Sequence, residues 1–148
     1  MLFRSTSATT AGTVTTAAQP NITSTGTLSS VSVSGTATIG NLVLSKFNET
    51  LPSSANTSTS ISPDVSTGTI FRYTANANFT FSSLTNAVAG SSATVIITQD
   101  GTGSRTLTST MKFAGASKTL STAAGSIDII GVFYDGTTYY ASLTKGYA

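Results

Sequence analysis

Apolar residues are sparse near the N-terminus of this chain and dense toward its C-terminus. In the stretch 22–44, Val31, Val33, Ala37 and Ile39 share one parity, with serine, threonine and glycine between them. Alternation with a period of two predicts β-strands, and the glycine and asparagine that follow predict a turn. Short strands of this kind present too little apolar surface to build a core alone. We therefore expect this stretch to pair with copies of itself.

Beyond Pro63 the apolar residues are dense enough to build a core. The alternating runs 69–74 and 79–81 flank a short polar stretch that predicts a tight turn, so we expect them to form a hairpin. The run 93–99 is apolar on both parities, as in a strand covered on two faces. We expect 104–108 to return as the partner strand of 93–99.

The chain ends in its clearest hairpin pattern. The run 127–134 is densely apolar, Asp135-Gly136 is a type I′ turn signal, and 138–144 closes the hairpin. Further short strands are expected around Gly115, from Met111, Phe113 and Leu120. The total of about seven or eight strands predicts an all-β domain, a small antiparallel β-sandwich or jelly-roll-like fold.

These patterns divide the chain into four parts. Residues 1–19 lack periodicity and are interpreted as an N-terminal arm; a transit peptide is the alternative, supported by a single arginine. Residues 20–46 hold the sparse strands, and the polar, proline-flanked residues 47–62 form a linker. Residues 63–148 form the C-terminal β domain.

Composition favours an assembled structural protein. Charged residues make up 8% of the chain, against roughly 25% in an average soluble domain. Serine and threonine make up about a third of the 148 residues. A hydroxyl-rich surface suits β-structure and does not keep neighbouring copies apart by charge repulsion. The net charge of +2 arises without a basic patch, which gives nucleic-acid binding little support.

Several chemistries lack their usual residues. The chain contains no cysteine and no histidine, which removes disulfides, a thiol nucleophile and the commonest general base and metal ligand. No run approaches the roughly 20 apolar residues of a membrane helix. We expect no cofactor, no metal site and no membrane partner.

The acidic residues could be taken for a site. The loop 100–103 could be a phosphate or calcium loop, but a strand follows it and no series of oxygen ligands does, so a hairpin turn is the better interpretation. Asp128 with Asp135, or Asp64 with Glu49, could be a glycosidase pair. Asp135 lies in a turn and Asp128 falls on the outward parity of its strand, which favours structural roles.

Tyrosines gather near the C-terminal hairpin, at Tyr134, Tyr139, Tyr140 and Tyr147. Clustered tyrosines can stack on sugars or anchor a protein interface, and Tyr139 and Tyr140 are the candidate receptor contacts. The competing interpretation is that Tyr139 or Tyr140 fills the core on one face of its strand.

Three segments resemble phage proteins. Ala17 to Leu42, AAQPNITSTGTLSSVSVSGTATIGNL, is similar to a segment common in tail-fibre and appendage proteins of tailed bacteriophages. Residues 93–108, ATVIITQDGTGSRTLT, and 127–148, IDIIGVFYDGTTYYASLTKGYA, resemble the C-terminal domain found in phage structural proteins. These motifs are fold signatures and carry no catalytic residues.

The resemblance implies a virion protein that assembles as a homotrimer, with residues 20–46 wound around a three-fold axis as a shaft. The residue pattern also predicts an assembly of copies, because symmetric copies can bury a narrow apolar face that one copy exposes. The predicted trimer-interface residues are Leu28, Val31, Val33, Ala37, Ile39, Leu42 and Leu44.

We therefore expect a non-enzymatic structural protein of a phage particle, either a trimeric fibre or spike-like appendage or a capsid decoration protein. The arm would attach to other virion proteins of the capsid, tail or baseplate. The alternative is a module at the tip of a tail fibre that binds a host surface glycan through Tyr139 and Tyr140.

Overall fold

The computed structural model describes residues 30–34 and 37–147, and the chain divides into two units between Val43 and Leu44. Residues 37–54 contain bends but no strand or helix. Leu28 lies outside the described residues. The large apolar side chains of this region are exposed in the single chain, namely Val31, Val33, Ile39, Leu42, Val43, Leu44, Phe47 and Leu51. The shaft and its trimer contacts therefore remain predictions.

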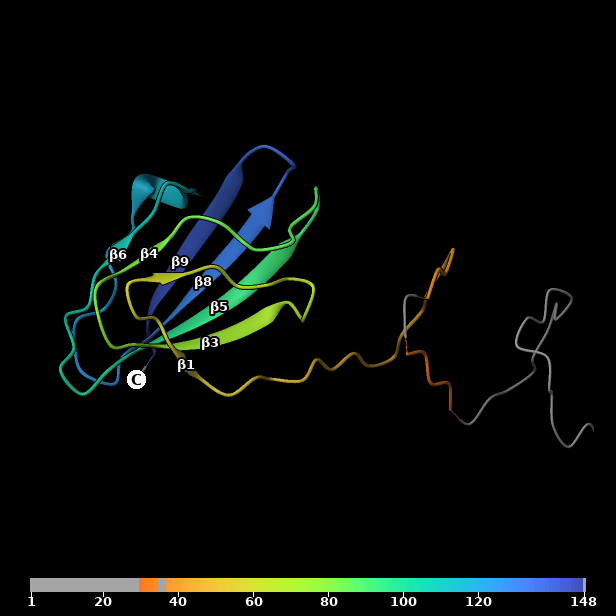
Figure 1. The fold of residues 1–148 in the computed structure, drawn as a ribbon, viewed down its shortest axis with the longest axis horizontal. Helices are drawn as coiled ribbons and strands as arrows, with labels where there is room; N and C mark the ends of the chain where they lie inside the picture. The colour runs from red at the N-terminus through yellow and green to blue at the C-terminus, as the bar shows by residue number, and fades with distance from the viewer. Residues whose placement is uncertain (1–29, 35–36, 148) are drawn as a thin grey trace, which may run out of the picture. The chain divides into compact units, whose positions relative to one another are not determined.

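The second unit is all-β, as predicted, and its described residues contain no α-helix. One short 3-10 helix, η1 (Ala114–Ala116), follows β7. The strands are β1 (Ala55–Asn56), β2 (Ser60–Ile61), β3 (Ile70–Ala75), β4 (Phe79–Phe81), β5 (Ser92–Gln99), β6 (Leu107–Thr108), β7 (Lys112–Phe113), β8 (Ile127–Tyr134) and β9 (Tyr139–Tyr147) (Figure 1). No helix in the described part of the chain is long and apolar enough to span a membrane.

The first six strands coil into a β-solenoid of about three turns. β1, β3 and β5 are parallel neighbours in the larger sheet, and β2, β4 and β6 are parallel neighbours in the smaller one. Within the solenoid, strands that follow each other in sequence, such as β3 and β4, therefore lie in different sheets. The prediction of an antiparallel sandwich or jelly roll is wrong. Neither 69–74 with 79–81 nor 93–99 with 104–108 forms a hairpin.

Side-chain hydrogen bonds explain why the predicted turn at residues 76–78 does not close a hairpin. It is a corner of the solenoid, where the chain passes from one sheet to the other. Asn76 Oδ1 accepts a hydrogen bond from Ser58 N at 2.9 Å, and Asn78 Oδ1 accepts one from Thr106 N at 3.0 Å. The two asparagines flanking one corner thus bind the coils on either side of it. Backbone N–H groups at the strand ends have no strand partner, and these amides give two of them, at Ser58 and Thr106, an acceptor. Residues 55–61, within the predicted linker, form β1 and β2 of the first coil.

The C-terminal hairpin is confirmed and closes the larger sheet. β8 pairs antiparallel with β5, and β9 pairs antiparallel with β8. β9 runs to Tyr147, three residues beyond the predicted end. β7 is parallel to the start of β9 at the far edge of the sheet. Reversal of strand direction at β8 ends the parallel stack.

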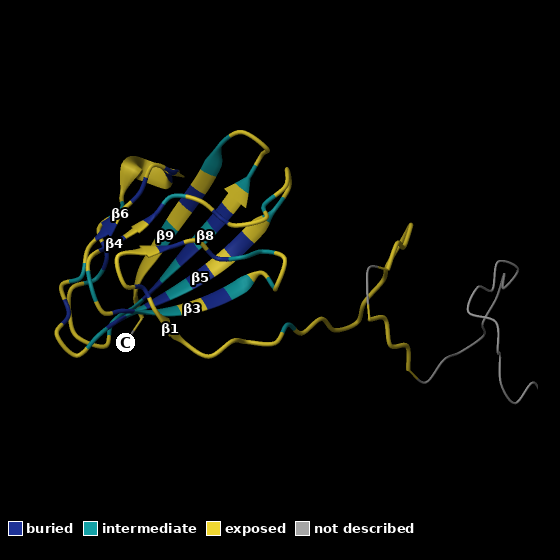
Figure 2. Cartoon of the chain, in the orientation of Figure 1, coloured by how far each residue is buried: buried dark blue, intermediate teal, exposed yellow. Residues whose placement is uncertain are grey.

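The core lies between the two sheets. β5 buries only one parity, since Ala93, Val95 and Ile97 are buried while Ile96 is half-buried, so the predicted cover on both faces is absent (Figure 2). Buried apolar side chains contributed by the facing sheet and the loops include Ile61, Phe79, Phe81, Leu84, Leu107, Met111 and Leu120. The outer face of the larger sheet is therefore open to a ligand or partner.

Asp128 is buried, and the prediction that it faces outward is wrong. Its carboxylate accepts hydrogen bonds from Ser121 N and Ser121 Oγ, both at 2.7 Å, and from Gly146 N at 3.0 Å. The β8–β9 register shifts between Ile127 and Ile129, where Gly146 takes a φ of 79°. A bulge at Gly146 thus turns its N–H toward the carboxylate instead of a strand partner.

We expect Asp128→Ala to lower the free energy of unfolding by roughly 3 kcal/mol, because it leaves buried N–H groups without an acceptor. Asp128→Asn keeps the shape and one acceptor oxygen and is expected to cost less. Urea denaturation of the full chain measures both values. Equal losses for the two variants, or a loss below about 0.5 kcal/mol for Asp128→Ala, would contradict this role.

Candidate ligand-binding groove

Two rows of side chains cross the outer face of the larger sheet. The register aligns Thr94, Gly131 and Ser142 in one row, all of them small. The next row toward the hairpin tip places Phe133 directly opposite Tyr140. Neighbouring residues on one face of a sheet are in contact distance. A trough of small residues therefore runs beside a raised pair of aromatic rings.

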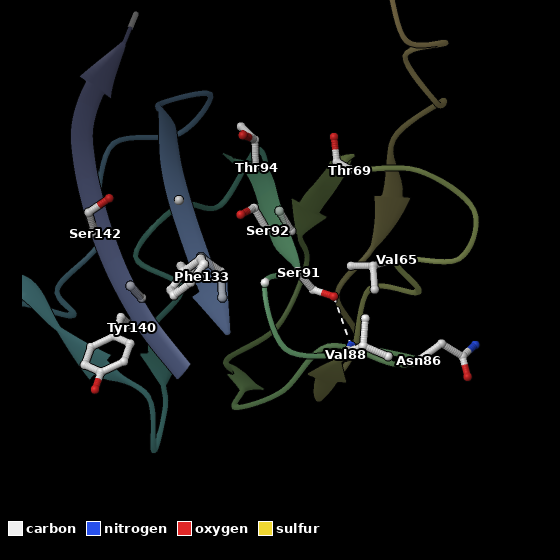
Figure 3. Close-up of a pocket in the computed structure, with 15 residues that line it drawn as sticks. Val65, Thr69, Asn86, Val88, Ser91, Ser92, Thr94, Phe133, Tyr140 and Ser142 are labelled. Carbon is white, nitrogen blue, oxygen red and sulfur yellow. Dashed lines mark hydrogen bonds between the residues drawn. The ribbon is translucent and has the colours of Figure 1, made fainter. Parts of the chain in front are cut away.

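Two loops from the solenoid turn this trough into an open groove of about 830 Å³. Val65 and Val88 form the wall opposite the aromatic rings, and Ser91 and Ser92 lie between the two walls (Figure 3). The Val88 loop is held in place because Val88 N donates a hydrogen bond to Ser91 Oγ at 3.0 Å. A volume of this size is within the range of small-molecule sites.

Among the described residues, those that line the groove offer uncharged polar groups and no charged side chain. Gly131 lies in the floor of the groove, and a side chain there would be crowded, because an added Cβ would lie 3.1 Å from Ser142 Oγ. The hydroxyls and the amide can donate and accept hydrogen bonds. They belong to Thr69, Asn86, Ser91, Ser92, Thr94 and Ser142, of which Thr69 and Asn86 already donate to the carboxylates of Glu49 and Asp64.

The two predicted receptor tyrosines have different environments. Tyr139 packs against the core and stacks on Tyr134, with 4.2 Å between the ring centroids and 17° between the planes. Tyr139 Oη also donates a hydrogen bond to Leu84 O at 3.4 Å. Tyr140 is 44% exposed and lines the groove. Lys112 Nζ lies 5.8 Å from the Tyr140 ring centroid, a cation–π arrangement.

Asp135 fixes the turn that carries Phe133 and Tyr140. Its Oδ1 accepts hydrogen bonds from Thr138 N at 2.6 Å and Thr137 N at 2.7 Å. These bonds lower the pKa of the Asp135 carboxyl below its ordinary value, chiefly through Thr138, with further help from Tyr140 and Lys112. The strand ends that present the two aromatic rings are therefore held by an ionised carboxylate.

The other acidic candidates do not form a site. Asp100 Oδ2 is paired with Arg105 at 2.7 Å, and the Arg105 guanidinium is the main reason that the pKa of Asp100 lies below its ordinary value. The loop 100–103 is a turn, as predicted, but it links the two sheets instead of closing a hairpin.

The proposed carboxylate pairs have separate partners. Glu49 accepts hydrogen bonds from Thr69 N and Thr69 Oγ1, whereas Asp64 accepts from Ser66 and Asn86. Asp128 is buried and Asp135 lies at the hairpin tip. Within residues 30–34 and 37–147, no group of three or more acidic, histidine or cysteine side chains could hold a metal ion.

Sequence reasoning missed Phe133 and the opposite wall. A turn at Asp135-Gly136 fixes the register of the hairpin, and this register places Phe133 across from Tyr140. Phe133 could therefore have been predicted from the hairpin alone. Val65 and Val88 could not have been predicted in this way, because they lie near the hairpin only through the corners of the solenoid. The predicted antiparallel pairing does not place these two loops beside the C-terminal hairpin.

One family model matches the chain: the one described as "Putative phage tail fibre C-terminal domain" matches residues 61–139, more than half of the 148 residues. The match runs from the end of β2 to the start of β9, and so includes most of the solenoid together with β7 and β8. No curated protein and no solved structure matches the chain.

The lowered pKa of Asp135 gives a pH-dependent prediction. A carboxyl with a depressed folded-state pKa stabilises the fold above its unfolded pKa, near 3.8, and this contribution is lost as pH falls through the lower folded pKa. We expect the wild-type chain to have a higher Tm than Asp135→Asn at pH 7, and the difference to disappear at low pH. Thermal denaturation between pH 7 and pH 2 measures it. A difference that stays constant across this range would contradict the role of the charge.

Proposed function

The chain belongs to this phage tail fibre C-terminal domain family, and from that membership we propose that it is a non-enzymatic structural protein of the virion. We propose that it assembles as a homotrimeric fibre or spike-like appendage, or as a capsid decoration protein. The family match over residues 61–139 carries this proposal. For the rest of the chain we propose that residues 20–46 form the shaft and residues 1–19 the arm.

The use of the acidic residues supports a structural role. The chain has five, and each accepts at least one hydrogen bond from a backbone N–H. Carboxylates engaged in this way hold loops and corners in place, and hydrogen bonds, chiefly from Ser66, Arg105 and Thr138 respectively, lower the pKa of Asp64, Asp100 and Asp135 below its ordinary value. General acid catalysis instead needs a carboxyl with a raised pKa. The five are Glu49, Asp64, Asp100, Asp128 and Asp135.

Exposed apolar side chains support the trimer. Val31, Val33 and Ile39 are 69%, 54% and 53% exposed in the single chain. Exposed apolar residues at closely spaced positions, with almost no charge near them in sequence, mark an association surface. Three symmetric copies could bury this narrow face along a common axis.

We expect light scattering of the full chain to give three times the 14.9 kDa mass of one copy. The combined substitution Val31→Ser, Val33→Ser and Ile39→Ser is expected to reduce the mass to that of a monomer, because the copies lose their apolar contact. Val88→Ser, which changes an equally exposed apolar residue of the second unit, is the matched control and should remain a trimer. A monomeric wild-type chain would remove the basis for the shaft.

The N-terminal arm, residues 1–19, lies outside the described residues, and we propose that it attaches the protein to other virion proteins. Deleting it should abolish binding to phage particles, as counted by immunogold electron microscopy, while the trimer mass is kept. A variant with a glycine-serine segment of equal length in its place should also fail to attach. Unchanged attachment of either variant would refute the anchoring role.

A second candidate function is recognition of a host surface glycan at the tip of a fibre. The groove beside Phe133 and Tyr140 favours it, since it combines exposed aromatic rings with hydroxyl groups on a rigid sheet. This function is compatible with the structural one, because tip and shaft occupy different parts of the chain.

A further inference from the structure

We propose that the groove on the outer face of the larger sheet binds a neutral oligosaccharide and discriminates against acidic ones. A sugar ring would lie with its C–H face on Phe133 and Tyr140, and its hydroxyls would reach toward Thr94 and Ser142. This inference rests on the second candidate function and adds the ligand class, the orientation and the residues that select it.

The aromatic pair provides the platform. Phe133 and Tyr140 are 45% and 44% exposed although they lie opposite each other on paired strands. An apolar C–H face can pack on such rings while the hydroxyl edge stays polar. Both rings project from strand backbones that the Asp135 turn holds together, so the platform is preorganised and little ordering is needed on binding.

The polar groups are placed for hydroxyl recognition. The floor presents Thr94 and Ser142 on either side of Gly131, and the missing side chain at Gly131 lets a ligand approach the sheet. Asn86, at the far wall, points away from the aromatic rings and donates its amide N–H to Asp64 Oδ1 at 2.9 Å, so it is not counted among these groups (Figure 3). Groups that both donate and accept match the hydroxyls of a sugar, which do the same.

The charge distribution selects a neutral ligand. The lining contains no charged side chain. Lys112 and Asp135, which have opposite signs, both interact with Tyr140, and the lining residues Thr69 and Asn86 are hydrogen-bonded to the carboxylates of Glu49 and Asp64. A carboxylate on the sugar would lose hydration on entering the groove without gaining an ionic partner. Acidic glycans should therefore bind more weakly than neutral ones of the same size.

The test uses the full chain on a glycan array that carries neutral oligosaccharides of glucose, galactose, mannose and rhamnose. Matched oligosaccharides containing sialic or uronic acid are printed beside them. We expect binding to neutral members only. The best neutral member is then titrated against each variant, with light scattering and thermal denaturation as checks of assembly and folding.

We expect Phe133→Ala and Tyr140→Ala each to weaken binding about tenfold, because each removes half of the platform. Tyr140→Phe, which keeps the ring, should retain binding. Thr94→Val changes an exposed hydroxyl without changing the shape and should weaken binding several-fold, which keeps the test decisive if an aromatic variant fails to fold. Tyr147→Ala, a tyrosine 47% exposed outside the groove, is the matched control and should bind normally.

The proposal would be overturned by no binding to any neutral oligosaccharide, by a preference for acidic ones, or by unchanged affinity in Phe133→Ala, Tyr140→Ala and Thr94→Val. A change of mass in Phe133→Ala or Tyr140→Ala would also overturn it, since this face would then be an interface between copies. The trimer mass is a separate measurement. If the chain is a trimer and binds no glycan, only the glycan-binding proposal fails. If it is a monomer and binds a neutral glycan, only the trimer proposal fails.

Discussion

The fold depends on acceptors for the backbone N–H groups at the corners of its coils. An antiparallel hairpin satisfies many of these groups within its own turn, but a solenoid corner passes to another sheet and leaves them without a strand partner. Asn76 and Asn78 supply acceptors to the adjacent coils, and Gln99 binds both N and O of Arg105. A chain with few charges thus uses short polar side chains to hold its coils in register.

The same requirement explains how the coils end. A parallel sheet could continue to add strands at its edge, and an exposed edge invites association. Here β8 reverses direction against β5, β9 covers β8, and the short β7 covers only the start of β9. Asp128 joins this cap to the segment before it by binding both Ser121 and Gly146. Its burial is explained by these three donors, with no cation required.

Local features of the fold could be predicted from the sequence, and the pairing could not. The apolar alternation located β3, β5 and β8 because it depends only on which side chains face the core. The same alternation occurs in parallel and antiparallel sheets, so it carries no information on strand direction. The corner at Asn76 and Asn78 has the composition of a hairpin turn, but its side chains bind other coils. Only contacts distant in sequence distinguish the two.

The candidate site shows the same division between local and distant information. Tyr140 could be chosen from its hairpin, and Phe133 follows from the register of that hairpin. The wall formed by Val65 and Val88 exists only because the solenoid brings two corners beside β5. All the carboxylates are engaged in holding the backbone, so a surface that recognises another molecule must rely on apolar rings and hydroxyls. Such contacts depend on shape and on hydrogen-bond geometry far more than on long-range charge. Because the few carboxylates of the chain bind its own backbone, this surface can select a partner only through uncharged groups.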